Sequence, residues 1–146
     1  MNHRTEPPAS KRALAITAWS RLFDFFIGTR WKRDRVLVRL GLTPNDAKAL
    51  HTLDMTVGKR MRELAQIWGT DASNATWVID RLESKGLAAR VPLEGDRRVT
   101  LVCLTKRGAK VRAQLLKAFY EPPAELLALT RAELQSLGEL LGKLSQ

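Results

Sequence analysis

Residues 60–105 read RMRELAQIWGTDASNATWVIDRLESKGLAARVPLEGDRRVTLVCLT, and this stretch decides the fold. Its first part predicts a short helix with one apolar face, because apolar residues recur at the spacing i, i+3, i+4 and i+7. The residues of that face are Met61, Leu64, Ala65 and Trp68. Gly69 follows them, and glycine is the residue most often found just past a helix end.

A second helix begins after Asp71, whose carboxylate can accept hydrogen bonds from the free N–H groups of the first turn. Its apolar face repeats the same spacing with Ala75, Val78, Ile79 and Leu82, and Gly86 marks its end. The other side of this helix carries Ser73, Asn74, Trp77, Asp80, Arg81 and Ser84.

Two short strands follow, and a turn containing Pro92 and Gly95 separates them. The order of helix, turn, helix and hairpin predicts a winged helix-turn-helix in a chain that is mainly α with a small β wing. An exposed helix face with hydroxyl and amide groups can read base edges in the major groove. Arginines at a hairpin tip can enter the minor groove.

The chain resembles the MarR family (multiple antibiotic resistance regulators) of bacterial transcription factors. The resemblance is carried by the segments RELA at 62–65, VIDRLESKGL at 78–87 and DRRVTLVCLT at 96–105, together with Arg90, Gly108 and the preceding helix LTPNDAKALHTL at 42–53. It implies a homodimeric DNA-binding regulator, usually a repressor, that binds a pseudo-palindromic operator. It also implies that a small aromatic or phenolic ligand releases the DNA.

The predicted DNA-binding residues lie on the second helix and on the wing. On the helix they are Ser73, Asn74, Thr76, Trp77 and Arg81, and on the wing they are Arg90, Asp96, Arg97 and Arg98. The resemblance implies that Arg98 enters the minor groove with Asp96 orienting it, while Arg97 meets a phosphate. Arg90 is expected to be a structural or backbone-contacting arginine.

Two of these residues leave alternatives open. Trp77 departs from the polar or basic residue that the family more often has there, and it either meets thymine methyl groups or folds against a neighbouring helix. Arg81 binds a phosphate or pairs with a carboxylate on its own helix. Because no acidic residue lies three or four positions away on its own helix, the phosphate is favoured.

Helices on both sides of this lobe are predicted to form a dimerisation region. Residues 11–33 read as a long helix with a wide apolar stripe, and residues 29–41 read as a basic connector that is either a solvated helix end or a phosphate-contacting corner. A helix from Lys106 should stop at Pro122-Pro123, and a capping box at Thr130–Glu133 starts a last helix. The predicted interface residues are Ile16, Leu22, Leu134, Leu137, Leu141 and Leu144, and the predicted ligand-pocket residues are Trp19, Phe23, Phe26 and His51.

These assignments divide the chain into a disordered tail at 1–10 and a single domain at 11–146. Within the domain, 11–40 and 106–146 are dimerisation helices and 42–105 is the winged lobe. We expect His51 to be partly buried and structural when it is not part of the pocket. By alternation from Leu101 along its strand, Cys103 should be a buried thiol.

Composition narrows the function further. The chain of 146 residues has a net charge of +10, and the basic excess falls in residues 1–40 and 60–112, whereas residues 113–146 are nearly neutral. This favours a polyanionic partner, so an architectural or ribosome-associated basic protein is the alternative to a regulator. No catalytic, metal-binding or phosphate-binding motif is present, which argues against an enzyme, a cofactor or a metal. The absence of a long apolar run predicts a cytoplasmic protein without a membrane partner.

Overall fold

The computed structural model describes residues 10–144, including every side chain among them except that of Arg97. The predicted tail, apart from Ser10, and the last two residues therefore lie outside the described part. The helices and strands are α1 (Lys11–Gly28), α2 (Arg30–Leu40), α3 (Pro44–Thr52), α4 (Met61–Trp68), α5 (Ala72–Ser84), β1 (Ala88–Leu93), β2 (Asp96–Leu104), α6 (Lys106–Phe119), α7 (Ala124–Leu127) and α8 (Arg131–Gly142). The fold is mainly helical with a small β wing, as predicted.

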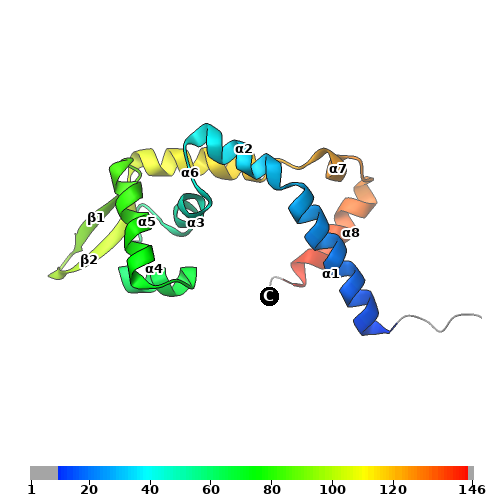
Figure 1. The fold of residues 1–146 in the computed structure, drawn as a ribbon, viewed down its shortest axis with the longest axis horizontal. Helices are drawn as coiled ribbons and strands as arrows, with labels where there is room; N and C mark the ends of the chain where they lie inside the picture. Colours follow the sequence, from blue (N-terminus) through cyan, green and yellow to red (C-terminus); the bar gives the residue numbers. More distant parts are fainter. Residues whose placement is uncertain (1–9, 145–146) are drawn as a thin grey trace, which may run out of the picture.

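The molecule is elongated, with a winged lobe at one end and two arm helices at the other (Figure 1). Helices α3, α4 and α5 and the β1–β2 hairpin form the lobe. Helix α6 leads away from the wing with α2 packed along it, and α1 and α8 occupy the far end (Figure 1). The winged lobe and the arm helices thus lie at opposite ends of the long axis.

The hydrophobic core lies entirely between Leu37 and Leu115. Its largest fully buried apolar side chains are Leu50, Leu53, Leu64, Ile79, Leu82, Val102 and Leu115. Among the described residues, α1, α7 and α8 contribute none that is buried. The core is therefore wider than the lobe predicted at 42–105, since residues of α2 and α6 belong to it.

The wing is an antiparallel pair in which Ala88 lies opposite Leu104 and Pro92 opposite Thr100, with a register shift at Pro92–Leu93. Lys59 adds a single bridge to Val102, with N···O distances of 3.1 and 2.8 Å. The segment before α4 is thereby joined to the wing through Lys59.

The predicted helix ends are confirmed. Gly69 ends α4 with a left-handed φ of 61°, which only glycine adopts without strain. Asp71 caps α5 by accepting a hydrogen bond from the Asn74 N–H at 2.7 Å. Thr130 and Glu133 form the capping box of α8, and α6 ends at Phe119, just ahead of Pro122-Pro123.

The single helix predicted at 11–33 is wrong, because the helix breaks at Thr29, and most of the basic connector predicted at 29–41 is helix α2. Thr29 separates α1 from α2, and its hydroxyl donates to the carbonyl oxygens of Phe25 and Phe26 at 2.9 and 3.2 Å. Leu37 is buried, and Val36 and Leu40 pack against the core. The high charge of this segment hides an apolar stripe of three residues that covers α6.

Two burial predictions are also wrong. Val102 and Leu104 are the β2 residues that face the core, so Cys103 points the other way and is half-buried. His51 is exposed on α3, because the inward side of that helix is taken by Ala47, Ala49 and Leu50.

The junction between α5 and α6 requires a glycine. Thr105 accepts the Gly108 N–H at 2.9 Å and donates its hydroxyl to the Gly86 carbonyl at 2.7 Å, so the start of α6 lies against the end of α5. A Cβ at Gly108 would stand 1.9 Å from the carbonyl oxygen of Leu87. This close approach of the Leu87 backbone explains why residue 108, three positions after Thr105, is a glycine.

We therefore expect Gly108→Ala to lower the free energy of unfolding by about 3 kcal/mol, since neither backbone can yield without moving the helix junction. Gly142→Ala is the matched control, because a Cβ there meets no described atom within 4 Å and alanine favours the helix. Urea unfolding followed by circular dichroism measures both. Equal stability of the two variants would contradict the close approach at Gly108.

Candidate nucleic-acid interface

The first turn of α5 holds its polar side chains in a hydrogen-bonded arrangement. The Ser73 hydroxyl donates to Asp71, and the Asn74 amide donates to the Thr70 hydroxyl at 2.7 Å. The pKa of Asp71 lies below its ordinary value because the Ser73 hydroxyl and the Asn74 N–H both donate to its carboxylate. Ser73 and Asn74 are exposed, as is Thr76 one turn further. The predicted contact residues are therefore presented to solvent on one helix end.

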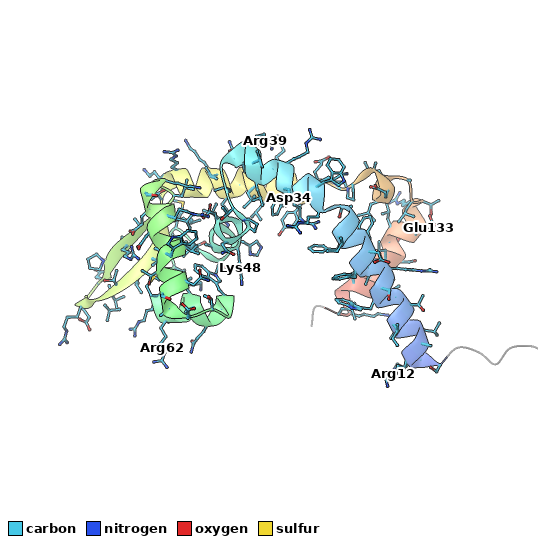
Figure 2. All side chains as sticks on the ribbon, viewed as in Figure 1. Arg12, Asp34, Arg39, Lys48, Arg62 and Glu133 are labelled. Atoms are coloured by element: carbon cyan, nitrogen blue, oxygen red, sulfur yellow. The ribbon has the colours of Figure 1, made fainter. Side chains whose placement is uncertain are left out.

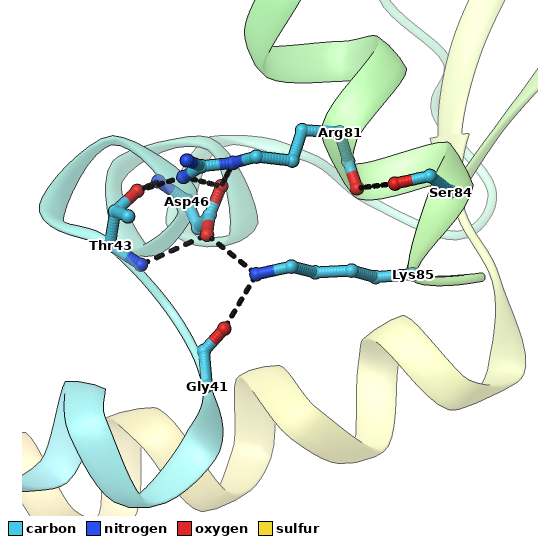
Figure 3. Close-up of polar contacts among 6 residues, drawn as sticks. All are labelled: Gly41, Thr43, Asp46, Arg81, Ser84 and Lys85. Atoms are coloured by element: carbon cyan, nitrogen blue, oxygen red, sulfur yellow. Dashed lines mark hydrogen bonds and ion pairs between the residues drawn. The ribbon is translucent and has the colours of Figure 1, made fainter.

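A buried carboxylate anchors the same helix from behind (Figure 3). Asp46 on α3 is fully buried, and Arg81 on α5 lies 2.6 Å from its Oδ1 atom. Lys85 lies 3.1 Å from Oδ2 and also donates to the Gly41 carbonyl at the end of α2. The Thr43 N–H donates to Oδ2 at 2.9 Å, and Arg81 also bonds to the Thr43 hydroxyl. This cluster joins α5, α3 and the turn after α2.

Charge balance explains why the carboxylate is tolerated there. Burial alone raises the pKa of Asp46, but hydrogen bonds from Arg81, the Thr43 N–H and Lys85 outweigh it. The net result is a pKa below the ordinary value of 3.8, so Asp46 is a carboxylate near neutral pH. Arg81 and Lys85 each carry a positive charge and Asp46 carries one negative charge, so the cluster beside α5 has a net positive charge.

The phosphate contact predicted for Arg81 is not supported, because its guanidinium is engaged with Asp46. The prediction considered only neighbours on the same helix, whereas the partner lies 35 residues earlier. Lys85 and Asp46 were missed as members of this cluster. The available signal was the i, i+4 spacing of Arg81 and Lys85, which places two cations on one stripe and calls for an anion from another element.

Arg90 was predicted to be either a structural or a DNA-backbone-contacting arginine, and its bonds in the structure are those of a structural residue. Its guanidinium pairs with Asp80 at 2.7 Å and with Glu83, and its backbone N–H donates to Glu83 at 2.9 Å. These bonds fasten the first wing strand to α5. They also pair the Asp80 carboxylate with a cation, which weakens its repulsion of a phosphate backbone, although Arg90 shares its single charge with Glu83.

The wing tip presents an arginine held at its base. Gly95, with a φ of 87°, makes the turn between β1 and β2. Asp96 accepts from the backbone N–H of Arg98 at 3.1 Å and from its Nε at 3.3 Å, which is the pairing that was predicted. The Arg98 side chain is 93% exposed, so its far end is available. The side chain of Arg97 lies outside the described part.

Trp77 is exposed in the middle of α5. The residue retains 54% of its accessible surface, and the Arg81 guanidinium lies 4.6 Å from the centre of its ring. Trp77 does not fold into the core, whose residues on this helix are Ala75, Val78, Ile79 and Leu82. Of the two alternatives left open by the sequence, burial against a neighbouring helix is excluded.

The residues assigned to the arms are spread over a wide surface. Ile16 and Trp19 on α1 are 58% and 67% exposed, and Leu134 on α8 and Leu144 just past its end are 39% and 74% exposed. Leu22 and Leu137 are partly buried, and Leu141 is 41% exposed. Phe23 is also exposed, with its ring 6.5 Å from that of Trp19.

A pocket of about 290 Å³ lies where α1 meets α2 beside the end of α6. Its lining includes Phe25, Phe26, Lys32, Arg33, Phe119 and Pro122. The Arg33 guanidinium lies 3.9 Å from the centre of the Phe26 ring. Of the four predicted pocket residues, only Phe26 lines it; Trp19 and Phe23 lie earlier on α1, and His51 is on α3.

The reading face of α5, the arginine-tipped wing and the helix pair α4–α5 define a winged helix-turn-helix DNA-binding protein. No group of three or more potential metal ligands occurs between residues 10 and 144. Within the same residues, no helix is both long and apolar enough to span a membrane.

Comparisons with known proteins agree with this class. Residues 40–99 match a family model described as MarR family. The chain is 33% identical over 110 residues to the uncharacterized HTH-type transcriptional regulator YpoP of Bacillus subtilis, covering 72% of this chain and 75% of that protein. It resembles wild-type MarR from E. coli with 27% identity and a TM-score of 0.69, covering 86% of this chain and 95% of that one.

A third match shows the fold alone. A MepR variant from S. aureus, solved bound to an oligodeoxyribonucleotide, shares 23% identity and a TM-score of 0.67 over 86% of this chain and 94% of that one. The family model, the relative YpoP and the match to E. coli MarR show that the chain belongs to the MarR family. It is a DNA-binding transcriptional regulator and not an enzyme.

We expect Asp46→Asn to lower the free energy of unfolding by about 3 kcal/mol, because it leaves Arg81 and Lys85 without their buried counter-charge. Asp34→Asn is the control, since it breaks only the exposed Arg30–Asp34 pair at 3.3 Å and should cost less than about 0.5 kcal/mol. Urea titration at neutral pH measures both changes.

The pH dependence checks that the effect is one of charge. A carboxyl whose pKa is lowered on folding stabilises the fold fully above its unfolded value of 3.8, and this contribution is lost as the pH falls through the folded value. The difference between the wild type and Asp46→Asn should thus be constant near neutral pH and shrink below about pH 4. A difference that persists in acid would assign the effect to packing.

Proposed function

We propose that this regulator is a homodimeric repressor that binds a pseudo-palindromic operator and is released by a small aromatic or phenolic ligand. The observation that carries the DNA-binding mode is the exposed, pre-ordered first turn of α5 together with the exposed Arg98 of the wing. Each protomer would place α5 in a major groove and its wing in the flanking minor groove. The half-sites would then lie about one helical turn apart.

The proposed DNA contacts are Ser73, Asn74, Thr76 and Trp77 on α5, and Arg97 and Arg98 on the wing. Arg81 and Arg90 act as positioning residues because carboxylates already hold their guanidinium groups. Arg62 on α4 is a further candidate for a phosphate contact, since it is exposed and projects from the lobe on the side opposite Arg39 (Figure 2).

The homodimer is supported by the apolar surface of the arms. Exposed aliphatic and aromatic residues follow α1 and α8, and neither helix has a buried residue in the described chain. Burying apolar surface contributes about 25 cal/mol per Å², so a second copy of the same arm offers a natural cover. Helices α1 and α8 together have four Lys or Arg residues against three Asp or Glu, whereas residues 60–112 have eleven against six.

For the ligand, the pocket beside Phe26 offers apolar walls with the cations Lys32 and Arg33 at its edge. An aromatic acid or phenolate suits such a lining, because its ring can pack on phenylalanine while its charge meets a cation. The pocket lies at the junction of arm and lobe, so a ligand that favours one spacing of the two lobes would change DNA affinity.

The test of DNA recognition is fluorescence anisotropy with the intergenic DNA upstream of the protein's own gene against a scrambled duplex, at ~150 mM salt. A specific regulator should prefer one duplex by roughly a thousandfold or more. Equal affinity for every duplex tried, including those enriched from a random pool, would instead favour an architectural protein.

Arg98→Ala should weaken binding to the preferred duplex by about 1–3 kcal/mol, because the wing arginine is lost from the minor groove. Arg39→Ala removes the same charge from α2, on the side away from Arg62, and should change affinity much less (Figure 2). The same anisotropy titration compares the two. Similar losses in both variants would mean that general charge, and not the wing, determines affinity.

The dimer should sediment at twice the 16.4 kDa of the chain in analytical ultracentrifugation. Ile16→Glu combined with Leu137→Glu should shift it toward the monomer, because both substitutions place charges in the proposed interface. Val38→Glu with Val57→Glu is the control, as these residues are 80% and 63% exposed outside the arms. A wild-type monomer at all concentrations would overturn the homodimer.

A further inference from the structure

Trp77 occupies the centre of the outward face of α5. The inward face is set by Ala75, Val78, Ile79 and Leu82, and at 100° per residue the opposite side is centred on Ser73, Trp77, Asp80 and Ser84. Trp77 is the large apolar member of this outward stripe, and it lies one turn after Ser73. If α5 enters a major groove, the tryptophan ring faces the base pairs.

The ring is held in this outward position by its own helix. The Arg81 guanidinium lies 4.6 Å from the ring centre, and Arg81 is itself fixed by Asp46 at 2.6 Å. The indole therefore rests against a side chain that is anchored in the lobe, while 54% of the residue stays open to solvent. Binding would immobilise few new rotamers, which favours affinity.

The surface that such a ring can recognise is limited. Base edges in the major groove are hydrogen-bond donors and acceptors, and the apolar group among them is the 5-methyl of thymine. The hydroxyls of Ser73 and Thr76 beside Trp77 suit polar edges, whereas the face of an indole suits a methyl group. Asp80 on the same stripe is paired with Arg90, which weakens its repulsion of DNA but does not remove it, since Arg90 also pairs with Glu83.

We propose that Trp77 is a specificity-determining residue that selects thymine in each half-site through contact with its 5-methyl group. This inference rests on the proposed function, because it requires α5 to lie in the major groove of a preferred sequence. It adds the base and the atom that are read.

The experiment uses the full-length protein and a duplex enriched by it from a random pool. Each thymine of the preferred half-site is replaced in turn by deoxyuridine, which removes the methyl group and keeps every hydrogen bond. At one thymine the wild type should lose about fourfold in affinity per half-site, the equivalent of the ~0.8 kcal/mol of one buried methyl group.

Two variants separate methyl recognition from a merely structural role. Trp77→Ala should bind the thymine and deoxyuridine duplexes equally, because the group that senses the methyl is gone. Trp31→Ala should keep the fourfold ratio. It is a matched control, since Trp31 on α2 is 52% exposed and also has cations near its ring, with Lys32 and Arg35 both 5.7 Å from the centre.

The outcomes distinguish this inference from the function on which it rests. If the wild type has a preferred sequence but tolerates deoxyuridine everywhere, or if Trp77→Ala keeps the wild-type ratio, the role of Trp77 is overturned and the regulator remains. If no preferred sequence can be enriched, both proposals fail. A uniform loss in Trp77→Ala with the ratio unchanged would leave Trp77 as a support for Arg81 and would also overturn the inference.

Discussion

The buried carboxylate of Asp46 is the interaction on which the arrangement of the lobe depends. Among the described residues, Asp46 is the charged residue whose surface is fully buried. Arg81 on α5 and Lys85, which follows α5, both form ion pairs with its carboxylate. A buried charge is costly when unpaired, so these groups must stay together as long as the lobe is folded. Asp46 also completes the capping box of α3 with Thr43. One side chain thus sets where α3 begins and how α5 lies across it.

The same cluster relates the reading helix to the rest of the molecule. Lys85 bonds both to Asp46 and to the Gly41 carbonyl, which closes α2. At its other end α2 meets α1 at Thr29, beside the pocket that contains Phe26. Helix α5 is therefore positioned relative to the arm by charge-assisted hydrogen bonds as well as by core packing. Because these bonds are short-ranged, α2 cannot move far from α5 without breaking them.

The sequence predicts those features that residues close together in the chain determine. Helix ends at Gly69, Asp71 and Thr130 are determined by residues within one turn, and all were predicted correctly. The partner of Arg81 and the exposure of His51 were not, because periodicity defines the faces of one element but not which element covers them. The burial of Cys103 was predicted wrongly because alternation was counted from Leu101, whereas Val102 and Leu104 are the buried residues of this strand. At the candidate site, the Asp96–Arg98 pair was predicted, and the Asp46 cluster was found only from the structure.

The exposed aromatic residues of the arm and of the winged lobe have different neighbours, and this difference indicates different binding partners. On α1, Trp19 and Phe23 continue a stripe with Ile16, and a continuous stripe of this kind matches the face of another helix. Trp77 stands among Ser73, Asp80 and Ser84, so it offers a single apolar group inside a polar surface. A protein partner would leave those polar groups poorly matched, whereas a major groove provides hydrogen-bonding edges interrupted by single methyl groups. The isolation of Trp77 is thus the feature that fits it to DNA.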